Sequence, residues 1–579
     1  MFKLLKKLRA IDWVLVFVLA CFVVLQVFFD IRLATYTRTI MNEMMNPAST
    51  TASILSIGGV MLLFALGSAA CTIIVGYIAA YISSFLSYEL RGELYEKVQG
   101  FSLAEIDKFS TAGLITRSTN DVQQVQMGVL IFLRVAISAP VTAIWAILEI
   151  QSVNLNLTFA SGGWLVFMAA AIGVIFGLVF PKFKVIQKLT DKLNGVTREN
   201  LTGLRVVRAY NAEQYQQDKF EKVNNDITST HLFITRVMGL MFPLLMLVMN
   251  GITLTIYWYG ADLINQNAGI TFADITTFSN LAMQVLAAFM MLTMLLVILP
   301  RSSVSANRIN EVLDTPYTIV DKSETTPIPR EKFGEIEFDH VYFKYPGADG
   351  YVLEDINFTA GGGETVAIIG STGSGKTTLI NLIPRLFDAT SGTVRVGGVD
   401  VKDASQRELH ASIGYVPQKG VLFSGTIEEN IKFGGNESNT DMYNAAKIAC
   451  ADGFIEEREG GYGSAVSQGG KNVSGGQKQR LSIARAVDVK PEILIFDDSF
   501  SALDYRTDKE VRANLRKNAD GATKIIVAQR IGTIKDADKI VVLDKGKVVG
   551  IGQHEQLLAS CDTYREIALS QLSKEELDL

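Results

Sequence analysis

The feature that most restricts the fold of this 579-residue chain is a long stretch without charged side chains. No Asp, Glu, Lys or Arg occurs between Glu43 and Glu89, and most residues there are apolar. A helix of about 17–25 apolar residues crosses a bilayer core. Because a buried soluble core does not account for several such runs, the sequence predicts membrane helices. Six tracts qualify: Trp13–Phe29, Ser53–Tyr81, Val129–Leu148, Leu157–Phe180, Val237–Tyr259 and Ile275–Leu299.

The basic residues of the loops predict the orientation of these helices. The segments after the second and fourth tracts are rich in Lys and Arg. The opposite loops are short, and Lys and Arg are almost absent from them, with Arg38 as the exception. By the positive-inside rule, both termini are predicted to be cytoplasmic. Residues 1–10 alternate basic and apolar side chains. This pattern favours a short interfacial elbow helix on an anionic membrane face over a merely solvated N-terminus.

The two basic segments are long, and structureless loops of their length would be unusual. Both keep helical apolar spacing, so the membrane helices are predicted to extend into the cytoplasm, each pair closed by a short transverse helix. We place these transverse helices at Thr116–Asp121 and Thr202–Tyr210. The alternative for both segments is ordinary solvated helical surface.

After Pro300 the composition becomes polar. Arg301–Asp314 is predicted to continue the sixth span as a polar helix, and the proline-containing segment 315–333 is predicted to be a linker. Residues 334–579 have the length of one soluble domain. The predicted order is therefore an elbow helix over residues 1–10, a membrane domain over 11–314, the linker and the soluble domain.

Early in the soluble domain, a buried strand over Thr365–Ile369 runs into a glycine-rich turn and an apolar helix. The turn fits the pattern G-x-x-x-x-G-K-[ST] in the strand–loop–helix context that a P-loop requires. Its residues are Gly370, Ser371, Thr372, Gly373, Ser374, Gly375, Lys376, Thr377 and Thr378. Backbone N–H groups of such a loop converge on phosphate oxygens, Lys376 reaches the β- and γ-phosphates, and Thr377 can bind Mg²⁺. We therefore predict a nucleotide site with Mg²⁺.

A second helix end suited to anions lies at Ser474, Gly475, Gly476 and Gln477, where an amphipathic helix begins. Ser474 is a natural N-cap, and the two glycines permit close backbone approach. One nucleotide needs only one P-loop. This helix end is therefore predicted to contact a phosphate held by another subunit.

The segment Ile493–Asp504 carries two adjacent acids. Four apolar residues lead directly into Asp497 and Asp498. A buried parallel strand that delivers acids to the C-terminal edge of a sheet has this form, and α/β folds bind ligands at that edge. The sequence thus predicts acidic side chains beside the P-loop.

Six spans followed by a P-loop domain, with Ser-Gly-Gly-Gln ahead of the aspartate strand, closely resemble ATP-binding cassette (ABC) exporters of the half-transporter, type IV multidrug-exporter-like kind. The likeness covers nearly the whole chain. It implies an all-α six-helix transmembrane domain followed by an α/β P-loop (ABC) nucleotide-binding domain, with ATP and Mg²⁺ as cofactors. It also implies a multi-pass protein of a bacterial cytoplasmic membrane, in contact with lipid.

The resemblance also implies roles for single residues. Tyr345 matches the aromatic residue that stacks on adenine, and Gln418 matches the glutamine that touches Mg²⁺ or the attacking water. Asp497 matches the acid that organises Mg²⁺ together with Thr377. Ser474–Gln477 matches the signature that completes the ATP site on a partner's P-loop. Thr116–Asp121 and Gly203–Ala209 lie where the family has its coupling segments.

Two positions depart from the pattern of active family members. Asp498 stands where a glutamate polarises the attacking water, and Gln529 stands where a histidine touches the γ-phosphate. The missing methylene withdraws the carboxylate by about 1.5 Å. A misplacement of about 1 Å can cost roughly 10²-fold in rate. Gln529 can donate a hydrogen bond but cannot take a proton. This P-loop is therefore predicted to hold ATP but to hydrolyse it poorly.

Because the signature is intact, a heterodimer would contain one impaired site and one good site. We therefore predict that the chain is the degenerate-site subunit of a heterodimeric exporter, with a partner half-transporter that carries Glu and His at the two positions. ATP binding and hydrolysis would drive alternating access of the membrane helices.

Other functions remain compatible with the sequence. One is a homodimeric exporter that uses Asp498 as its base, and another is an ATP-gated regulator or channel. The last two spans are rich in methionine, which suits varied hydrophobic or amphipathic substrates but also ordinary helix packing. Small hydrophobic drugs, lipids and peptides are therefore candidate substrates, and no nucleic-acid partner is expected.

Overall fold

The fold comes from a computed structural model. It describes residues 2–266, 269–332, 334–435, 438–519 and 521–572. The chain divides into two compact units. The first, which we call the membrane unit, comprises Met1–Lys97 and Leu114–Asp314, and the second, the sheet unit, comprises Val98–Gly113 and Thr315–Leu579.

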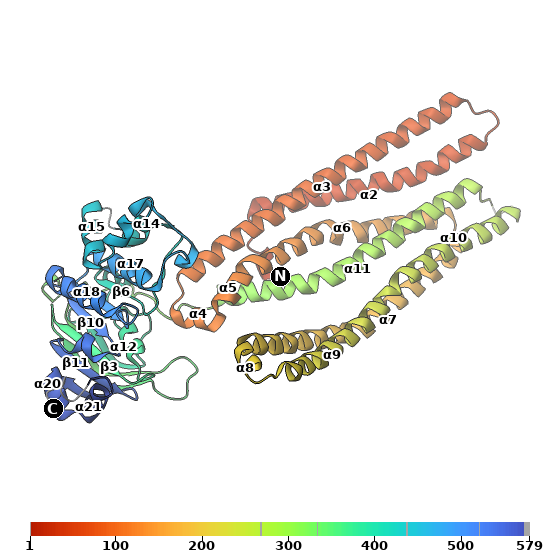
Figure 1. Ribbon diagram of the computed structural model, residues 1–579. Coiled ribbons are helices and arrows are strands. Elements are labelled where there is room, and N and C mark those ends of the chain that lie inside the picture. Colours follow the sequence, from red (N-terminus) through yellow and green to blue (C-terminus); the bar gives the residue numbers. More distant parts are fainter. Residues whose placement is uncertain (1, 267–268, 333, 436–437, 520, 573–579) are drawn as a thin grey trace. The chain divides into compact units, whose positions relative to one another are not determined.

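Helices make up the membrane unit (Figure 1). They are α1 (Phe2–Leu5), α2 (Ala10–Met45), α3 (Thr51–Gln99), α5 (Thr111–Thr116, which straddles the division), α6 (Val122–Val153), α7 (Leu155–Thr202), α8 (Leu204–Ala209), α9 (Glu213–Gly239), α10 (Met241–Asn265) and α11 (Phe272–Asp314). Helix α6 packs against α11 and α2, while α7 packs against α9 and α10.

Six helical segments of the described chain are long and apolar enough to cross a membrane. They are Ala10–Met45, Thr51–Gln99, Thr111–Ser152, Leu155–Thr202, Glu213–Asn265 and Phe272–Asp314. Each predicted tract lies inside one of them, so the six predicted spans are confirmed. Helix α3 has 49 residues, which at 1.5 Å per residue makes about 74 Å, more than twice a bilayer core. The helix is therefore long enough for the predicted extension into the cytoplasm, which stays a prediction.

The first predicted transverse helix was placed wrongly. Arg117–Asp121 is a five-residue π-helical turn that joins α5 to α6 without a break. The short separate helix is instead α4 (Leu103–Phe109), which ends at Ser110 in the left-handed region, at a φ of +58°. Since a π turn still continues a helix, residues 117–121 belong to one helical segment with α5 and α6 and do not form a separate transverse helix.

The second predicted transverse helix is confirmed in position. Gly203 leaves helical geometry after α7, and α8 (Leu204–Ala209) forms the short turn before α9 (Figure 1). At the N-terminus, α1 lies in the predicted elbow. Lys3 pairs with Asp314 of α11, and Lys7 pairs with Glu93 of α3. Part of the elbow's basic charge is therefore bound by acids of the membrane unit.

Two main sheets form the core of the sheet unit. The six-stranded sheet has the order β12 (Lys547–Gly552), β11 (Lys539–Asp544), β3 (Thr365–Gly370), β10 (Thr523–Val527), β9 (Ile493–Asp497) and β6 (Ile413–Val416). Its strands are parallel except for β12. The second sheet is antiparallel, with the order β2 (Leu353–Ala360), β1 (Ile336–Phe343), β4 (Ser391–Val396) and β5 (Val399–Asp400).

Shorter elements complete the sheet unit (Figure 1). Strands β7 (Gly425–Thr426) and β8 (Ala465–Val466) pair with each other. The helices are α4, α12 (Lys376–Asn381), α13 (Gln406–Ala411), α14 (Ile427–Ile431), α15 (Asn439–Ile448), α16 (Asp452–Glu456), α17 (Gly475–Asp488), α18 (Tyr505–Asn518), α19 (Ile531–Ile534), α20 (His554–Ser560) and α21 (Asp562–Leu569).

Apolar runs explain why the central strands occupy the middle of the sheet. Every residue of β9 is buried, as is every residue of β3 after Thr365, in keeping with strands covered on both faces. Neighbouring parallel strands have their carboxyl ends at the same edge of the sheet. The register pairs Val527 of β10 with Asp497 of β9 and with Ile368 of β3. This edge therefore collects the P-loop and the residues that follow β9, β10 and β6.

Candidate functional site

The P-loop connects the end of β3 to α12. Gly373 and Gly375 have φ values of +82° and +99°, in the left-handed region that glycine adopts without a Cβ penalty. A Cβ atom on Gly370 would overlap the carbonyl oxygen of Leu543 on the neighbouring strand β11. The backbone conformation and the close packing therefore require glycine at these positions. The loop has the geometry that a phosphate cradle needs.

Lys376 lies folded back over its own loop. Its Nζ donates hydrogen bonds of 2.8 Å to the carbonyl oxygens of Gly370 and Ser371. Burial lowers the pKa of Lys376, although the nearby Asp498 and Asp497 act in the opposite direction. An ammonium group that is buried and bound to neutral carbonyls gains strongly from a bound anion. The loop thus presents a cation at the place predicted for phosphate.

Thr377 and Asp497 form the candidate metal site. The Thr377 hydroxyl donates a hydrogen bond of 2.9 Å to Oδ1 of Asp497. Mg²⁺ prefers such oxygen ligands and commonly binds through one or two carboxylates together with substrate phosphates. No group of three His, Cys, Asp or Glu side chains able to hold a metal occurs among the described residues. The donor set therefore fits a metal ion that shares its coordination with a nucleotide.

Asp497 and Asp498 are both nearly inaccessible, at 4% and 7% exposure. Burial raises the pKa of each carboxyl. For Asp497 the hydrogen bond from Thr377 opposes this effect, and for Asp498 bonds from Gln418 and Ser501 do so. Asp498 also has a φ of +46°, so the chain turns sharply where β9 ends.

Gln529 and Asp498, the two residues that depart from the family pattern, touch each other. Nε2 of Gln529 donates a hydrogen bond of 2.9 Å to Oδ2 of Asp498. Nε2 of Gln418 approaches the same oxygen at 3.4 Å. One oxygen of the carboxylate is therefore held between two amide groups that cannot accept a proton.

A cavity of about 350 Å³ lies over this edge of the sheet. Its lining brings together much of the predicted site and adds Val352 and Val527, which the sequence did not indicate. The lining residues are Val352, Thr372, Gly373, Gly375, Lys376, Thr377, Thr378, Gln418, Asp497, Asp498, Val527 and Gln529.

Tyr345 and the signature lie outside that lining. The Tyr345 hydroxyl bonds to Thr378 Oγ1 at 2.9 Å, and its ring packs edge-on against Phe343 and Phe387. The tyrosine is thus tied to the P-loop helix, next to the cavity. At the start of α17, Ser474 forms the predicted N-cap and shares a capping box with Gln477.

Comparison with known proteins identifies the family. Residues 13–289 match the model of the ABC transporter transmembrane region, and residues 353–501 match the ABC transporter model. An uncharacterized ABC transporter ATP-binding protein of Mycobacterium tuberculosis is 40% identical over 526 residues, which cover 90% of each chain. The chain belongs to the ABC transporter family. It is an ATP-hydrolysing transporter of exporter architecture, and half-transporters of this family work as dimers in the membrane.

Two further relatives of this ABC transporter are informative. A probable multidrug resistance ABC transporter ATP-binding/permease protein of Bacillus subtilis, YheI, is 32% identical, over 82% of this chain and 81% of its own. A solved structure of a bacterial Atm1-family ABC exporter with ATP bound matches with a TM-score of 0.77 at 22% identity. It covers 96% of this chain and 98% of its own, and it supports the fold alone.

Helix α4 is the part of this ABC transporter that the sequence reasoning missed. A signal was present, because Ser102-Leu103-Ala104-Glu105 is a capping box, which marks a helix start. The structure forms both of its reciprocal bonds, and Leu103 and Ala104 pack against the apolar core of the sheet unit. The segment that docks on the sheet unit is therefore α4, and residues 117–121 belong to the membrane unit.

Proposed function

We propose that this chain is the degenerate-site subunit of a heterodimeric ABC exporter. Its own P-loop holds ATP, and hydrolysis takes place at a second site built from the partner's P-loop and the Ser474–Gln477 signature. The observation that carries the proposal is the contact between Gln529 and Asp498. A carboxylate oxygen that already accepts an amide hydrogen bond is poorly placed to take a proton from water.

The remaining site residues support ATP binding at this site. Lys376 and the P-loop backbone would hold the phosphates, Tyr345 would stack on adenine, and Thr377, Gln418 and Asp497 would hold Mg²⁺. When bound, the metal ion neutralises charge on the phosphate oxygens. Hydrolysis in the partner's site would reset the transport cycle, while the occupied degenerate site keeps the two ATP-binding domains in contact.

The proposed substrates are hydrophobic or amphipathic small molecules exported from a bacterial cytoplasm. The similarity to YheI, a probable multidrug resistance transporter, supports this class. Exposed methionines of α10 and α11, such as Met246, Met290 and Met294, supply adaptable apolar surface. The basic loops support cytoplasmic termini by the positive-inside rule.

A homodimeric exporter is the second candidate function, because Asp498 keeps a carboxyl whose pKa burial raises. ATPase measurements on the purified full-length chain, alone and with a partner chain that carries Glu and His, separate the two. The heterodimer predicts slow turnover alone and fast turnover with the partner. Replacing the partner's glutamate should then cost about 10²-fold or more.

The matching change in this chain, Asp498→Ala, should leave turnover of the heterodimer within about threefold, because only the slow site is altered. Turnover of the isolated chain at about 1–10 s⁻¹ would contradict the proposal and favour the homodimer. The same conclusion would follow if Asp498→Ala abolished turnover of the pair as fully as the change in the partner.

A further inference from the structure

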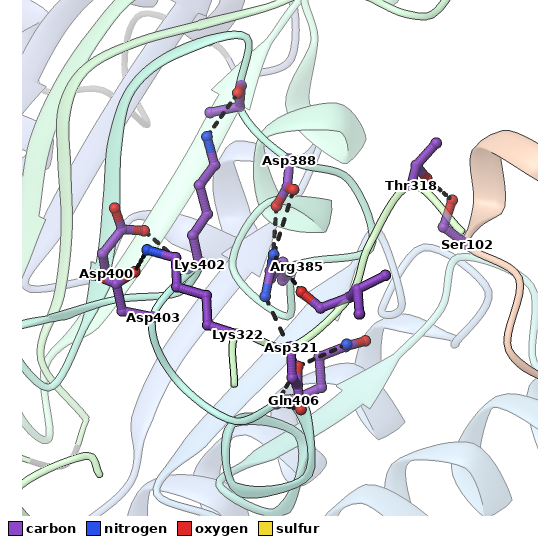
Figure 2. A network of polar contacts seen from close by, with 12 residues as sticks. Ser102, Thr318, Asp321, Lys322, Arg385, Asp388, Asp400, Lys402, Asp403 and Gln406 are labelled. Atoms are coloured by element: carbon purple, nitrogen blue, oxygen red, sulfur yellow. Dashed lines mark hydrogen bonds and ion pairs between the residues drawn. The ribbon is translucent and has the colours of Figure 1, made fainter. Parts of the chain in front are cut away.

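The predicted linker is bound tightly to the sheet unit. We call its segment Tyr317–Lys322 the strap; it belongs to no helix or strand of the described structure. Asp321 accepts hydrogen bonds of 2.8–3.2 Å from the backbone and side chain of Gln406, and Lys322 pairs with Asp403 (Figure 2). These bonds fix the strap's course, so it is not a flexible tether.

One end of the strap is fastened to α4. The backbone N–H of Thr318 donates a hydrogen bond of 2.9 Å to Oε1 of Glu105. The Thr318 hydroxyl bonds to Ser102 at 2.9 Å (Figure 2). The other oxygen of Glu105 accepts the Ser102 N–H at 2.7 Å. Glu105 is only 3% exposed. One buried carboxylate therefore joins the start of α4 to the strap.

The surroundings of Glu105 favour its ionised form. Burial alone would raise its pKa, but the hydrogen bonds from Ser102 and Thr318 outweigh burial and hold the pKa below its ordinary value. An ionised carboxylate accepts several hydrogen bonds at once. The link between α4 and the strap is thus a charge-assisted one.

The middle of the strap is held by Arg385, which follows the P-loop helix α12. Its Nε donates 2.8 Å to Asp388, its Nη2 reaches the carbonyl of Val320 at 3.5 Å, and its Nη1 lies 4.0 Å from Asp321. Figure 2 shows the guanidinium between Asp388 and Asp321. Arg385 is 5% exposed and has a φ of +54°, so its backbone is held where a non-glycine residue is uncommon.

These contacts form an unbroken chain from the ATP site to α4. Helix α12 carries Lys376 and Thr377 at its start, and Arg385 lies just beyond its end. From Arg385 the chain continues through the strap to Glu105. Since α4 follows α3 in sequence and the strap follows α11, both connections to the membrane helices are attached to it.

We propose that Arg385 and Glu105 are positioning residues of a coupling route that carries ATP binding from the P-loop helix, through the strap, to α4. The route concerns ATP binding and does not depend on whether the dimer is homomeric or heteromeric. Its two ends, Glu105 and Arg385, are buried charged groups, whereas the strap between them is largely exposed. A buried charge has few alternative partners, so these two residues are the ones to test.

Hydrogen–deuterium exchange of the full-length transporter in nanodiscs tests this route, with and without ATP and Mg²⁺. Two regions are compared in one sample: the P-loop, which reports ATP binding, and residues 98–113, which report α4. In the unaltered protein, ATP should change exchange in both. In Arg385→Lys and in Glu105→Gln, the ATP-dependent change at α4 should fall by about fivefold or more, while P-loop protection stays.

Both substitutions change the shape of the side chain little. Lys lacks the fork with which Arg reaches Asp388 and the strap together. Gln cannot accept both N–H bonds that Glu105 takes, since half of its amide is a donor. Matched controls are Arg407→Lys on α13 and Asp107→Asn on α4, both exposed residues with the same chemical change. The controls should behave like the unaltered protein.

Several results would overturn the inference. Exchange at α4 that rises equally with and without ATP would mean that the residues only stabilise the fold. Loss of P-loop protection in Arg385→Lys would place this residue in ATP binding instead. If ATP does not change the exchange of α4 in the unaltered protein, no such route exists. If the losses in the Arg385→Lys, Glu105→Gln double variant equal the sum of the two single losses, the two residues share no route.

Discussion

Nε2 of Gln529 donates a hydrogen bond of 2.9 Å to Oδ2 of Asp498, so the two unusual residues of the ATP site act as one unit. Their effects on hydrolysis should therefore not be additive. Asp498→Glu alone leaves no proton-accepting partner at position 529, and Gln529→His alone leaves the short carboxylate. We expect each single change to raise ATPase activity by less than about threefold, and the double change to raise it by about 10²-fold.

Steady-state ATPase of the isolated full-length chain measures this effect, with Gln418→Ala added to the double variant as a negative control. A gain in the double variant no larger than the product of the two single gains would contradict a joint role. In a heterodimer, the double variant should also loosen the coupling between transport and hydrolysis, because the second site no longer stays occupied.

Lys376→Ala should weaken ATP binding to this chain by about 10²-fold, since it removes charge-assisted bonds worth about 1.5–3 kcal/mol. Binding of a fluorescent ATP analogue to the purified chain measures this loss. Lys344→Ala, an exposed lysine near Tyr345, is the control and should bind normally. Unchanged affinity in Lys376→Ala would mean that the analogue binds elsewhere.

Thr377→Val should reduce the dependence of ATP binding on Mg²⁺. The valine keeps the side chain's shape but loses the hydroxyl that lies 2.9 Å from Asp497. We expect metal affinity in the presence of ATP to fall by about 10–100-fold. Titration of Mg²⁺ into chelator-treated protein measures it. Thr378→Val, which loses only the bond to Tyr345, should keep the metal dependence, and a loss there as large as in Thr377→Val would refute the assignment.

Local patterns account for the parts of this structure that were predicted correctly. The P-loop, the acid strand and the N-cap Ser474 each depend on neighbours in sequence, and the structure forms all three. The contact between Gln529 and Asp498 was not predictable in the same way. It requires β10 to lie beside β9, and that strand order is a tertiary property.

The misplaced transverse helix has a similar cause. The break before α5 is made by Ser110 in a left-handed conformation, which residue type alone does not signal. The strap likewise lies within the segment 315–333, whose prolines predict a linker. Its partners Glu105 and Arg385 lie far away in sequence, so only the folded chain reveals that it is bound.

Asp488, at the end of α17, should make stability depend on pH. Burial together with Asp441 raises its pKa to about 6, against the lowering effect of Lys432 and Lys490. Between about 4 and 6 the folded state holds a proton that the unfolded state has lost. The stability contributed by Asp488 therefore falls as pH rises through this window, and the penalty is full above it.

Asp488→Asn should consequently raise the melting temperature at pH 7.5 by about 2–4 °C, for a gain of about 1 kcal/mol, and by less at pH 5. Calorimetry of the full-length chain at the two pH values measures the difference. Glu457→Gln, at an exposed acid, should shift neither value. An equal gain at both pH values would mean that charge at Asp488 is not responsible.

Gly128 of α6 is a point of close approach between that helix and α11. A Cβ atom there would overlap the side chain of Ser302, which is fully buried and donates 2.8 Å to the carbonyl oxygen of Gln124. Gly128→Ala should therefore destabilise the membrane unit by about 1–3 kcal/mol through overpacking. Thermal unfolding in detergent, followed by tryptophan fluorescence, measures the loss.

Ser302→Gly should restore much of the stability of Gly128→Ala, because it removes the atoms that the new Cβ meets. By itself Ser302→Gly should destabilise, since it leaves a small void and loses the bond to Gln124. Gly92→Ala, on an open face of α3 with nothing within 4 Å, should be neutral or slightly stabilising. If Gly128→Ala is as harmless as Gly92→Ala, the helices α6 and α11 are not packed at this glycine.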